Sequence, residues 1–156
     1  MTSRWRGVQS TPDARDTVPV AMPETNDGFK RVYSGAPWEK TVGYCRALRA
    51  GDHVYVTGTA PVADDGSVYG VGDPFAQAER CFVLIERALN ELGADKRAVV
   101  RTRMYVTAVQ HWEAYGRAHA EFFAGHHPAT TMVEVKGLID PAMMIEVEVD
   151  AYVGSG

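Results

Sequence analysis

The sequence contains only two cysteines, Cys45 and Cys81, and it lacks the spacing of any common metal site. The cysteines lie in a predicted strand and a predicted helix, without a CxxC motif. We therefore expect buried, reduced thiols and no structural disulfide. The five histidines show neither HExxH nor carboxylate spacing, so we expect no metal site.

Long hydrophobic runs and an excess of basic residues are also absent. No apolar run approaches the ~20 residues of a membrane span, and residues 1–19 contain no segment of the signal-peptide type. The formal net charge of −4 provides no basic surface for nucleic acid or an anionic membrane. We therefore expect a cytoplasmic protein that has neither nucleic acid nor a membrane as its partner.

Two motifs of large enzyme classes are missing as well. Without a GxSxG sequence, a nucleophilic serine on a strand-to-helix elbow is not expected. The glycine-rich segment 66–72 (GSVYGVG) lacks the Lys-Ser/Thr ending and the βαβ unit of a phosphate-binding loop.

The length of 156 residues is suited to one domain with its own core. Residues 1–28 are rich in Thr, Ser, Pro, Asp and Arg and show no periodicity. This predicts a flexible arm, or one that becomes ordered only against a neighbouring subunit. Residues 29–156 are predicted to form a single domain.

Hydrophobic periodicity predicts two helices and about five strands, in the order β-β-α-β-α-β-β. Residues 41–50 and 53–59 read as a hairpin. Gly58 interrupts the second of these strands, which predicts a β-bulge or the close approach of another group. A third strand is expected at 99–107, and a helix at 111–124 has five residues on its inner side: Trp112, Tyr115, His119, Phe122 and Phe123.

The first helix has clear start and stop signals. Asp73 is the expected N-cap, and Pro74 occupies the first helical position. Apolar residues then recur every three or four positions up to Leu92, which gives one buried stripe. Gly93 is the expected left-handed cap at the end.

The segment 127–153 reads as two alternating strands joined by a short Gly/Pro turn, each with one face against a core. In the second strand, Ile145, Val147 and Val149 alternate with carboxylates. Three neighbouring carboxylates on one face repel each other, so this face is either solvated or lines a pocket. The carboxylates are Glu146, Glu148 and Asp150.

These elements predict an α+β sandwich with both helices on one face of a mixed sheet. The other face has no covering layer within the chain, which favours burial against further copies of the chain and pockets between subunits. Its expected residues are Tyr44, Arg46, Arg101, Arg103, Glu146, Glu148, Met144 and Met132.

Residues 41–153 resemble the Rid family, the reactive intermediate deaminases, which are also called the YjgF family. The most specific match is the pattern Pro128-Ala129, Val133-Glu134-Val135 and Ile145-Glu146-Val147-Glu148. Further matches are Gly43-Tyr44, Val56-Thr57-Gly58 with Pro61, the helix end at Leu92-Gly93, strand 99–106 and Glu121-Phe122-Phe123.

The resemblance implies a chorismate-mutase-like fold, a homotrimer whose sheets form a central barrel, and three clefts at the subunit interfaces. It implies neither metal nor cofactor. In deaminating members, water hydrolyses an enamine or imine in each cleft to a keto compound and ammonia. By resemblance, Tyr44 and Gly58 contribute to substrate binding, together with Met132 on the same predicted face, and Glu146 is the catalytic carboxylate.

The sequence departs from this pattern at Thr130, which occupies the position of the arginine that grips the substrate carboxylate. A guanidinium binds a carboxylate through two charge-assisted hydrogen bonds, whereas a threonine hydroxyl offers one neutral donor. Another cation is therefore needed for an anionic substrate. Arg46 is our candidate because it lies two residues from Tyr44 in the predicted strand, and Arg101 and Arg103 are alternatives.

The sequence therefore leaves three functions open. The first is a Rid-type trimer that binds a small metabolite and hydrolyses an enamine or imine. The second is a ligand-binding or regulatory trimer that has lost the chemistry. The third is a pathway enzyme with altered chemistry in the same cleft, such as deamination of an aminomuconate-like compound or a cyclisation.

Overall fold

The computed structural model describes residues 27–154, so the predicted arm lies outside the described residues apart from positions 27 and 28. The strands are β1 (Lys30–Val32), β2 (Ala47–Ala50), β3 (His53–Thr59), β4 (Val99–Val106), β5 (Ala129–Glu134) and β6 (Ile145–Tyr152). The helices are α1 (Pro74–Glu91) and α2 (Trp112–Phe123), with a π-helical turn η1 (Glu39–Gly43) and two 3-10 turns, η2 (Lys96–Ala98) and η3 (Val109–His111).

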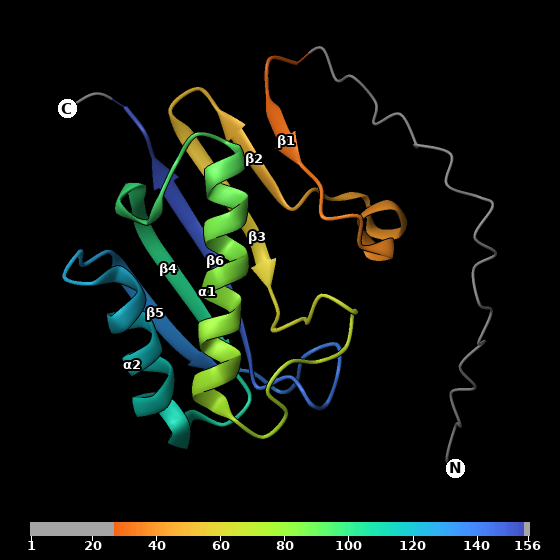
Figure 1. The fold of residues 1–156 in the computed structure, drawn as a ribbon, viewed down its shortest axis with the longest axis vertical. Coiled ribbons are helices and arrows are strands. Elements are labelled where there is room, and N and C mark those ends of the chain that lie inside the picture. The colour runs from red at the N-terminus through yellow and green to blue at the C-terminus, as the bar shows by residue number, and fades with distance from the viewer. Residues whose placement is uncertain (1–26, 155–156) are drawn as a thin grey trace.

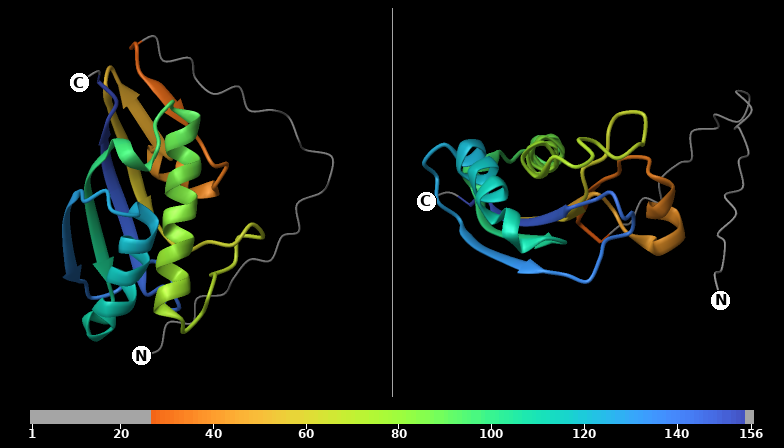
Figure 2. Two further views of the ribbon diagram at one scale, coloured as in Figure 1. Left: turned by 60° about the vertical axis from the view of Figure 1, so that its left-hand side comes forward. Right: turned by 90° about the horizontal axis from the view of Figure 1, so that it is seen from below.

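The strands form one mixed sheet in the order β1-β2-β3-β6-β4-β5. β4 and β5 are parallel and are connected through α2, whereas the other neighbouring strands are antiparallel. Both helices lie on the same face of this sheet (Figure 1 and Figure 2). The predicted α+β class, with two helices on one face of a mixed sheet, is therefore confirmed.

The start and stop signals of α1 work as the sequence predicts. The Asp73 side chain accepts a hydrogen bond of 3.0 Å from the backbone N–H of Ala76, and Pro74 is the first helical residue. Gly93 adopts φ +74°, a conformation that costs glycine little, and thus ends the helix. The buried stripe of α1 packs on the central strands of the sheet.

The core lies between α1 and the helix-facing residues of β3, β4 and β6. Branched aliphatic residues alternate along these strands with polar ones, which places one face of each strand in the core. The buried core residues of these elements include Val54, Val56, Phe82, Ile85, Leu89, Met104, Val106, Ile145, Val147 and Val149. The alternation predicted for β6 is confirmed.

The structure corrects the N-terminal part of the predicted element order. A short strand, β1, precedes the others and pairs with β2. Within the predicted strand 41–50, only the last four residues form β2, because residues 39–43 turn as η1. The buried carboxylate of Glu39 holds the preceding loop through the backbone N–H groups of Ser34 and Gly35 and the Ser34 hydroxyl.

The two strands predicted within 127–153 are present as β5 and β6, but they are not neighbours in the sheet, because β4 lies between them. The prediction that one face of β5 packs against a core holds only for Met132. The other residues of β5 are exposed, because β5 is an edge strand of the sheet. Trp112 was expected on the inner side of α2, but 57% of it is exposed.

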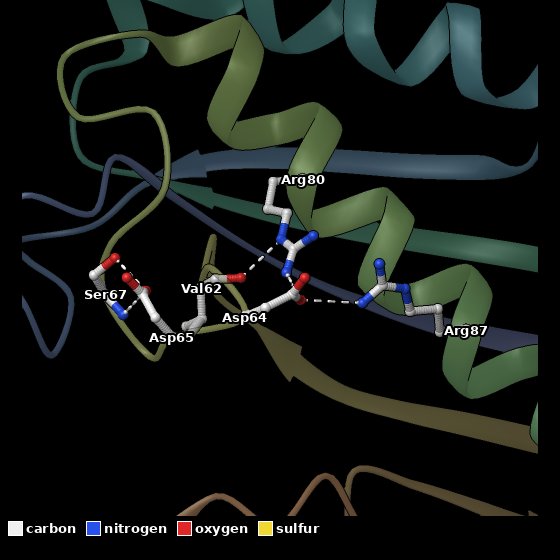
Figure 3. Close-up of polar contacts among 6 residues, drawn as sticks. All are labelled: Val62, Asp64, Asp65, Ser67, Arg80 and Arg87. Atoms are coloured by element: carbon white, nitrogen blue, oxygen red, sulfur yellow. Dashed lines mark hydrogen bonds and ion pairs between the residues drawn. The ribbon is translucent and has the colours of Figure 1, made fainter.

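The long loop between β3 and α1 is attached to α1 by arginines (Figure 3). Arg80 donates to the carbonyl oxygen of Val62 at 2.7 Å and to the Asp64 carboxylate at 2.7 Å. Arg87 approaches the same carboxylate at 3.4 Å. The Asp65 carboxylate accepts from the backbone N–H and the hydroxyl of Ser67, which stabilises the turn between Ala63 and Ser67.

Candidate functional site

Of the three carboxylates on β6, only Glu146 lacks a donor within the described part of the chain. Glu148 accepts a hydrogen bond of 2.8 Å from the Tyr105 hydroxyl, and Asp150 accepts one of 3.1 Å from Arg103 Nη1. Arg103 Nη1 also lies 3.5 Å from Glu148. Two carboxylates are thus committed to partners on β4, and Glu146 is left available.

The surroundings of Glu146 make its carboxyl easier to protonate than an ordinary one. Burial raises its pKa, the neighbouring charge of Glu148 raises it further, and the charge of Arg46 opposes both. A carboxyl whose pKa is moved towards neutrality is suited to both accepting and donating a proton during a reaction. Glu146 is therefore the strongest candidate for acid–base chemistry.

Gly58 lies directly beside Glu146, as its place in the sequence suggested. The register between β3 and β6 shifts between Val56 and Thr59, which confirms the predicted bulge. A Cβ atom at position 58 would overlap Glu146 Oε1 and lie 3.1 Å from Glu146 Cδ. Glycine at this position therefore leaves room for the carboxylate against the backbone of β3.

A buried glutamine on α1 positions the start of β6. The Gln77 side-chain amide donates to the carbonyl oxygen of Ala142 at 2.9 Å and accepts from the backbone N–H of Met144 at 2.7 Å. The Gln77 amide thus donates to one backbone group and accepts from another, as the backbone of a neighbouring strand would. These two bonds position the chain just before Glu146. Gln77 is fully buried, so its amide has no competing water.

The Arg46 guanidinium lies at the bulge. Its Nη2 atom donates to the carbonyl oxygens of Thr57 and Gly58, both at 2.7 Å. Burial lowers the pKa of Arg46, while the nearby groups of Tyr44, Glu39 and Glu146 raise it. Within residues 27–154, the buried Nε atom of Arg46 has no hydrogen-bond partner.

Tyr44 follows η1 and precedes β2, so the prediction that it lies within a strand is wrong. It has an extended backbone, and its N–H donates to the carbonyl oxygen of Glu39 at 3.1 Å. Its phenol still lies close enough to Arg46 to affect the charge there. The structure thus groups four predicted residues: Tyr44, Arg46, Gly58 and Glu146.

Thr130 does not belong to this group within one chain. It pairs with Thr102 of β4, and the two hydroxyls are 2.6 Å apart. Thr102 is fully buried, and its hydroxyl also lies 2.9 Å from Nε2 of His119 on α2. Thr130 is therefore on the helix-covered face of the sheet, whereas Glu146 is on the opposite face.

Met132 lies on the same helix-covered face as Thr130. It pairs with Met104 and packs against the core, so its predicted place on the open face of the sheet is wrong. Met144 also packs against the core. Of the alternative cations, Arg103 is paired with Glu148 and Asp150, whereas Arg101 is exposed on the open face.

Thr130, Thr102 and His119 form a chain of hydrogen bonds, which we call the hydroxyl chain. The sequence did not indicate that Thr102 and His119 would be connected to Thr130. His119 is predicted on the inner side of the helix at 111–124, and its bond to Thr102 of the sheet confirms this. Its pKa is lowered by burial, and its ring contacts Phe82 and Phe123. Thr102 could have indicated the chain, because it alternates with the same period as the buried residues Met104 and Val106 of its strand. A hydroxyl at such a position needs a hydrogen-bond partner in the core.

Both cysteines are free thiols, as expected, but only Cys81 is buried. Cys45 is partly exposed and precedes β2, so its predicted burial within a strand is wrong. The described residues contain no cluster of three potential metal ligands, and none of their helices has the length and apolarity to cross a bilayer. A groove of about 310 Å³ lies between α1 and α2, away from Glu146. It is lined by Phe75, Glu79, Phe82, Val83, Ala118, Glu121 and Phe122.

A family model described as Endoribonuclease L-PSP matches residues 36–153. SCO2049 of Streptomyces coelicolor is 40% identical over 131 residues, which cover 84% of this chain and 97% of that protein. The 3-aminoacrylate deaminase RutC of Acinetobacter baylyi is 30% identical over 110 residues, which cover 70% of this chain and 86% of RutC.

Solved structures of YjgF and Rid proteins are also similar to this chain. Rv2704 of Mycobacterium tuberculosis, a member of the YjgF/YER057c/UK114 family, has a TM-score of 0.73 and 42% identity over 80% of this chain and 99% of its own. YyfA of Yersinia pestis, a Rid-family protein, has a TM-score of 0.67 and 27% identity over 70% of this chain and 87% of its own.

Proposed function

Because the chain belongs to the endoribonuclease L-PSP family, which includes the YjgF and Rid proteins, we propose that it hydrolyses a small enamine or imine to a carbonyl compound and ammonia. The reaction takes place in clefts between the subunits of a homotrimer and uses no metal or organic cofactor. The observation that carries the proposal is Glu146, a partly buried carboxylate beside Gly58 that accepts no hydrogen bond from residues 27–154.

The proposed chemistry uses the two protonation states of Glu146. As a carboxylate, it takes a proton from water while the water oxygen adds to the imine carbon and the C=N bond becomes a single bond. As an acid, it then returns that proton to the nitrogen, which gives a carbinolamine. The carboxylate next takes the proton of the new hydroxyl group and passes it to the amino group, so the C=O bond forms, the C–N bond breaks and ammonia leaves. One water is consumed, and Glu146 returns to its starting state.

Two further observations favour deamination over nuclease activity. RutC, which is 30% identical, is named for its action on 3-aminoacrylate, an enamine. The family description names an endoribonuclease, but the net charge of −4 is unfavourable for binding a polyanion. We therefore place the substrate among small enamines and imines.

Thr130 favours a second candidate function, a ligand-binding or regulatory trimer without chemistry. Its neutral hydroxyl is bonded to Thr102 and cannot make the paired charge-assisted bonds that a guanidinium makes with a carboxylate. A cleft that has exchanged this arginine for a threonine binds an anionic substrate less tightly. The substrate is then either neutral or is held by another cation.

A single assay distinguishes these candidates. An amino-acid oxidase generates imines that carry a carboxylate, an amine oxidase generates neutral imines, and ammonia release is followed above the spontaneous rate. Glu146→Gln should reduce the acceleration by about 10²- to 10⁴-fold, the usual contribution of a general acid–base group. Asp150→Asn, on the same strand and face but paired with Arg103, should remain active.

If the wild-type protein accelerates neither class of imine, the deaminase proposal fails and the binding function is preferred. If Glu146→Gln is as active as the wild-type protein, Glu146 is not the catalytic carboxylate. Acceleration of the neutral imine alone would assign the substrate to the class without a carboxylate.

A further inference from the structure

We propose that Arg46 is a positioning residue, whose guanidinium holds the bulge at Thr57–Gly58 against Glu146 and does not bind the substrate. This inference rests on the proposed function, because it assigns a role within the same catalytic site. It replaces our sequence-based expectation that Arg46 grips a substrate carboxylate.

The segment around Arg46 is attached to the bulge by several bonds. Arg46 Nη2 donates to the carbonyl oxygens of Thr57 and Gly58 at 2.7 Å each. In addition, the Thr57 N–H donates to the Arg46 carbonyl oxygen at 3.1 Å, and the Thr57 hydroxyl donates to the Cys45 carbonyl oxygen at 2.7 Å. The Arg46 N–H is itself bonded to Val32 of β1 at 2.8 Å. Arg46 thus connects the edge of the sheet to the residues that face Glu146.

These bonds use the part of the guanidinium that carboxylate recognition requires. A guanidinium binds a carboxylate with two parallel N–H groups, from either Nη1 and Nη2 or Nε and Nη2. Both arrangements include Nη2, and the two hydrogens of Nη2 in Arg46 already point at carbonyl oxygens. The remaining edge of the guanidinium is blocked by Cδ. As it is placed here, Arg46 has no free bidentate edge.

The charge of Arg46 has a second effect at the same place. Arg46 lowers the pKa of Glu146, in opposition to burial and to the negative charge of Glu148 on the same strand. Two other ionisable groups are coupled to Glu146, the Tyr105 phenol on β4 and the Cys81 thiol on α1. Among these neighbours Arg46 is the cation, so its removal should make Glu146 easier to protonate.

Two substitutions separate positioning from substrate binding. Arg46→Gln removes the charge and both carbonyl bonds, whereas Arg46→Lys retains the charge without the planar fork. Arg49→Gln is the matched control. Arg49 also donates to backbone carbonyls, those of Gly51 at 2.8 Å and Leu92 at 2.9 Å, but its bonds lie away from Glu146.

The first measurement is a ¹³C NMR titration of glutamate side chains, with the Glu146 signal assigned through its loss in Glu146→Gln. This readout does not depend on activity, so it tests Arg46 even if the deaminase proposal fails. We expect Glu146 to titrate at higher pH in Arg46→Gln. In Arg46→Lys and Arg49→Gln, it should titrate close to the wild-type pH.

The second measurement is the steady-state kinetics of imine hydrolysis. Misplacement of the bulge in Arg46→Gln should lower kcat by about tenfold or more with little change in KM, and it should move the acidic limb of the pH profile upwards. A large rise in KM for carboxylate-bearing imines alone, with an unchanged Glu146 titration, would show that Arg46 binds substrate and would overturn the inference. An unchanged titration together with unchanged kinetics would overturn it as well.

Discussion

The two parts of the predicted site lie on opposite faces of the sheet and differ in chemistry. On the open face, Glu146 lies beside Gly58 and near the charge of Arg46. On the helix-covered face, Thr130 and Thr102 form a neutral hydroxyl chain that ends at His119. The first part contains a carboxyl with a shifted pKa and no hydrogen-bond donor in the described chain, whereas the second is satisfied by its own bonds.

This difference indicates that the two faces of the sheet contribute to different properties of the protein. Within the described chain, burial, Arg46 and Glu148 act on the pKa of Glu146. Thr130, in contrast, is on the exposed edge strand β5, and its hydroxyl is bonded to the buried Thr102. We therefore expect changes near Glu146 to affect reaction rate, and changes in the hydroxyl chain to affect stability.

Among the substitutions that compare the two faces, Gly58→Ala should have the largest effect. The added Cβ would overlap Glu146 Oε1, the far end of a flexible side chain that can move away. Because the backbone of Gly58 is not left-handed, alanine itself is tolerated. We expect kcat/KM for imine hydrolysis to fall by roughly 100-fold through misplacement of the carboxylate, with less than about 2 kcal/mol lost in urea unfolding.

Gly116→Ala provides the control for this comparison. Gly116 is within α2, and a Cβ atom there meets no other heavy atom within 4 Å. Alanine should raise helix stability by about 0.5–1 kcal/mol and leave activity unchanged. If Gly58→Ala retained full activity, the close approach of Gly58 to Glu146 would have no part in the reaction.

A smaller effect is expected from Thr102→Val, and it concerns stability where that of Gly58→Ala concerns reaction rate. Valine keeps the shape of the buried side chain but removes the hydroxyl between Thr130 and His119. Loss of these bonds should lower the free energy of unfolding by about 1–3 kcal/mol. Thr131→Val, an exposed neighbour on β5, should change it by less than about 0.5 kcal/mol.

Activity measurements on the same variant sharpen the comparison. Because the hydroxyl chain lies across the sheet from Glu146, kcat in Thr102→Val should stay within about threefold of the wild-type value, less than 1 kcal/mol in activation free energy. A loss of activity as large as that of Gly58→Ala would show that the two faces act as one site.

Local patterns in the sequence predict α1 and β6 well because their signals are contained within the elements. The cap at Asp73, the first-turn Pro74 and the left-handed Gly93 each act on neighbouring residues. Along β6, burial alternates residue by residue as the hydrophobic pattern indicates. Gly58 was also informative, since a glycine in a β-branched run has few explanations other than a bulge or a close neighbour.

Strand pairing and the partners of charged side chains were not predictable in this way. β5 and β6 are close in sequence, yet β4 lies between them because the parallel β4–β5 pair is connected through α2. Nothing local indicates that residues 39–43 form a π-helical turn ahead of Tyr44. The bonds of Arg46 to the bulge join positions 11 and 12 residues away, so only the folded hairpin reveals them.

The smallest effect concerns His119, whose pKa is lowered by burial from the ordinary value of 6.5. The unfolded chain then binds a proton at this residue more readily than the folded chain. The stability that His119 contributes is therefore complete above pH 6.5 and is lost as the pH falls through its folded pKa. In urea unfolding between pH 7.5 and 5.5, His119→Gln should reduce the pH dependence of stability, whereas His127→Gln, at an exposed position, should retain it. If the kinetics of imine hydrolysis followed the His119 transition as closely as stability does, the helix-covered face would share in the chemistry that we assign to Glu146.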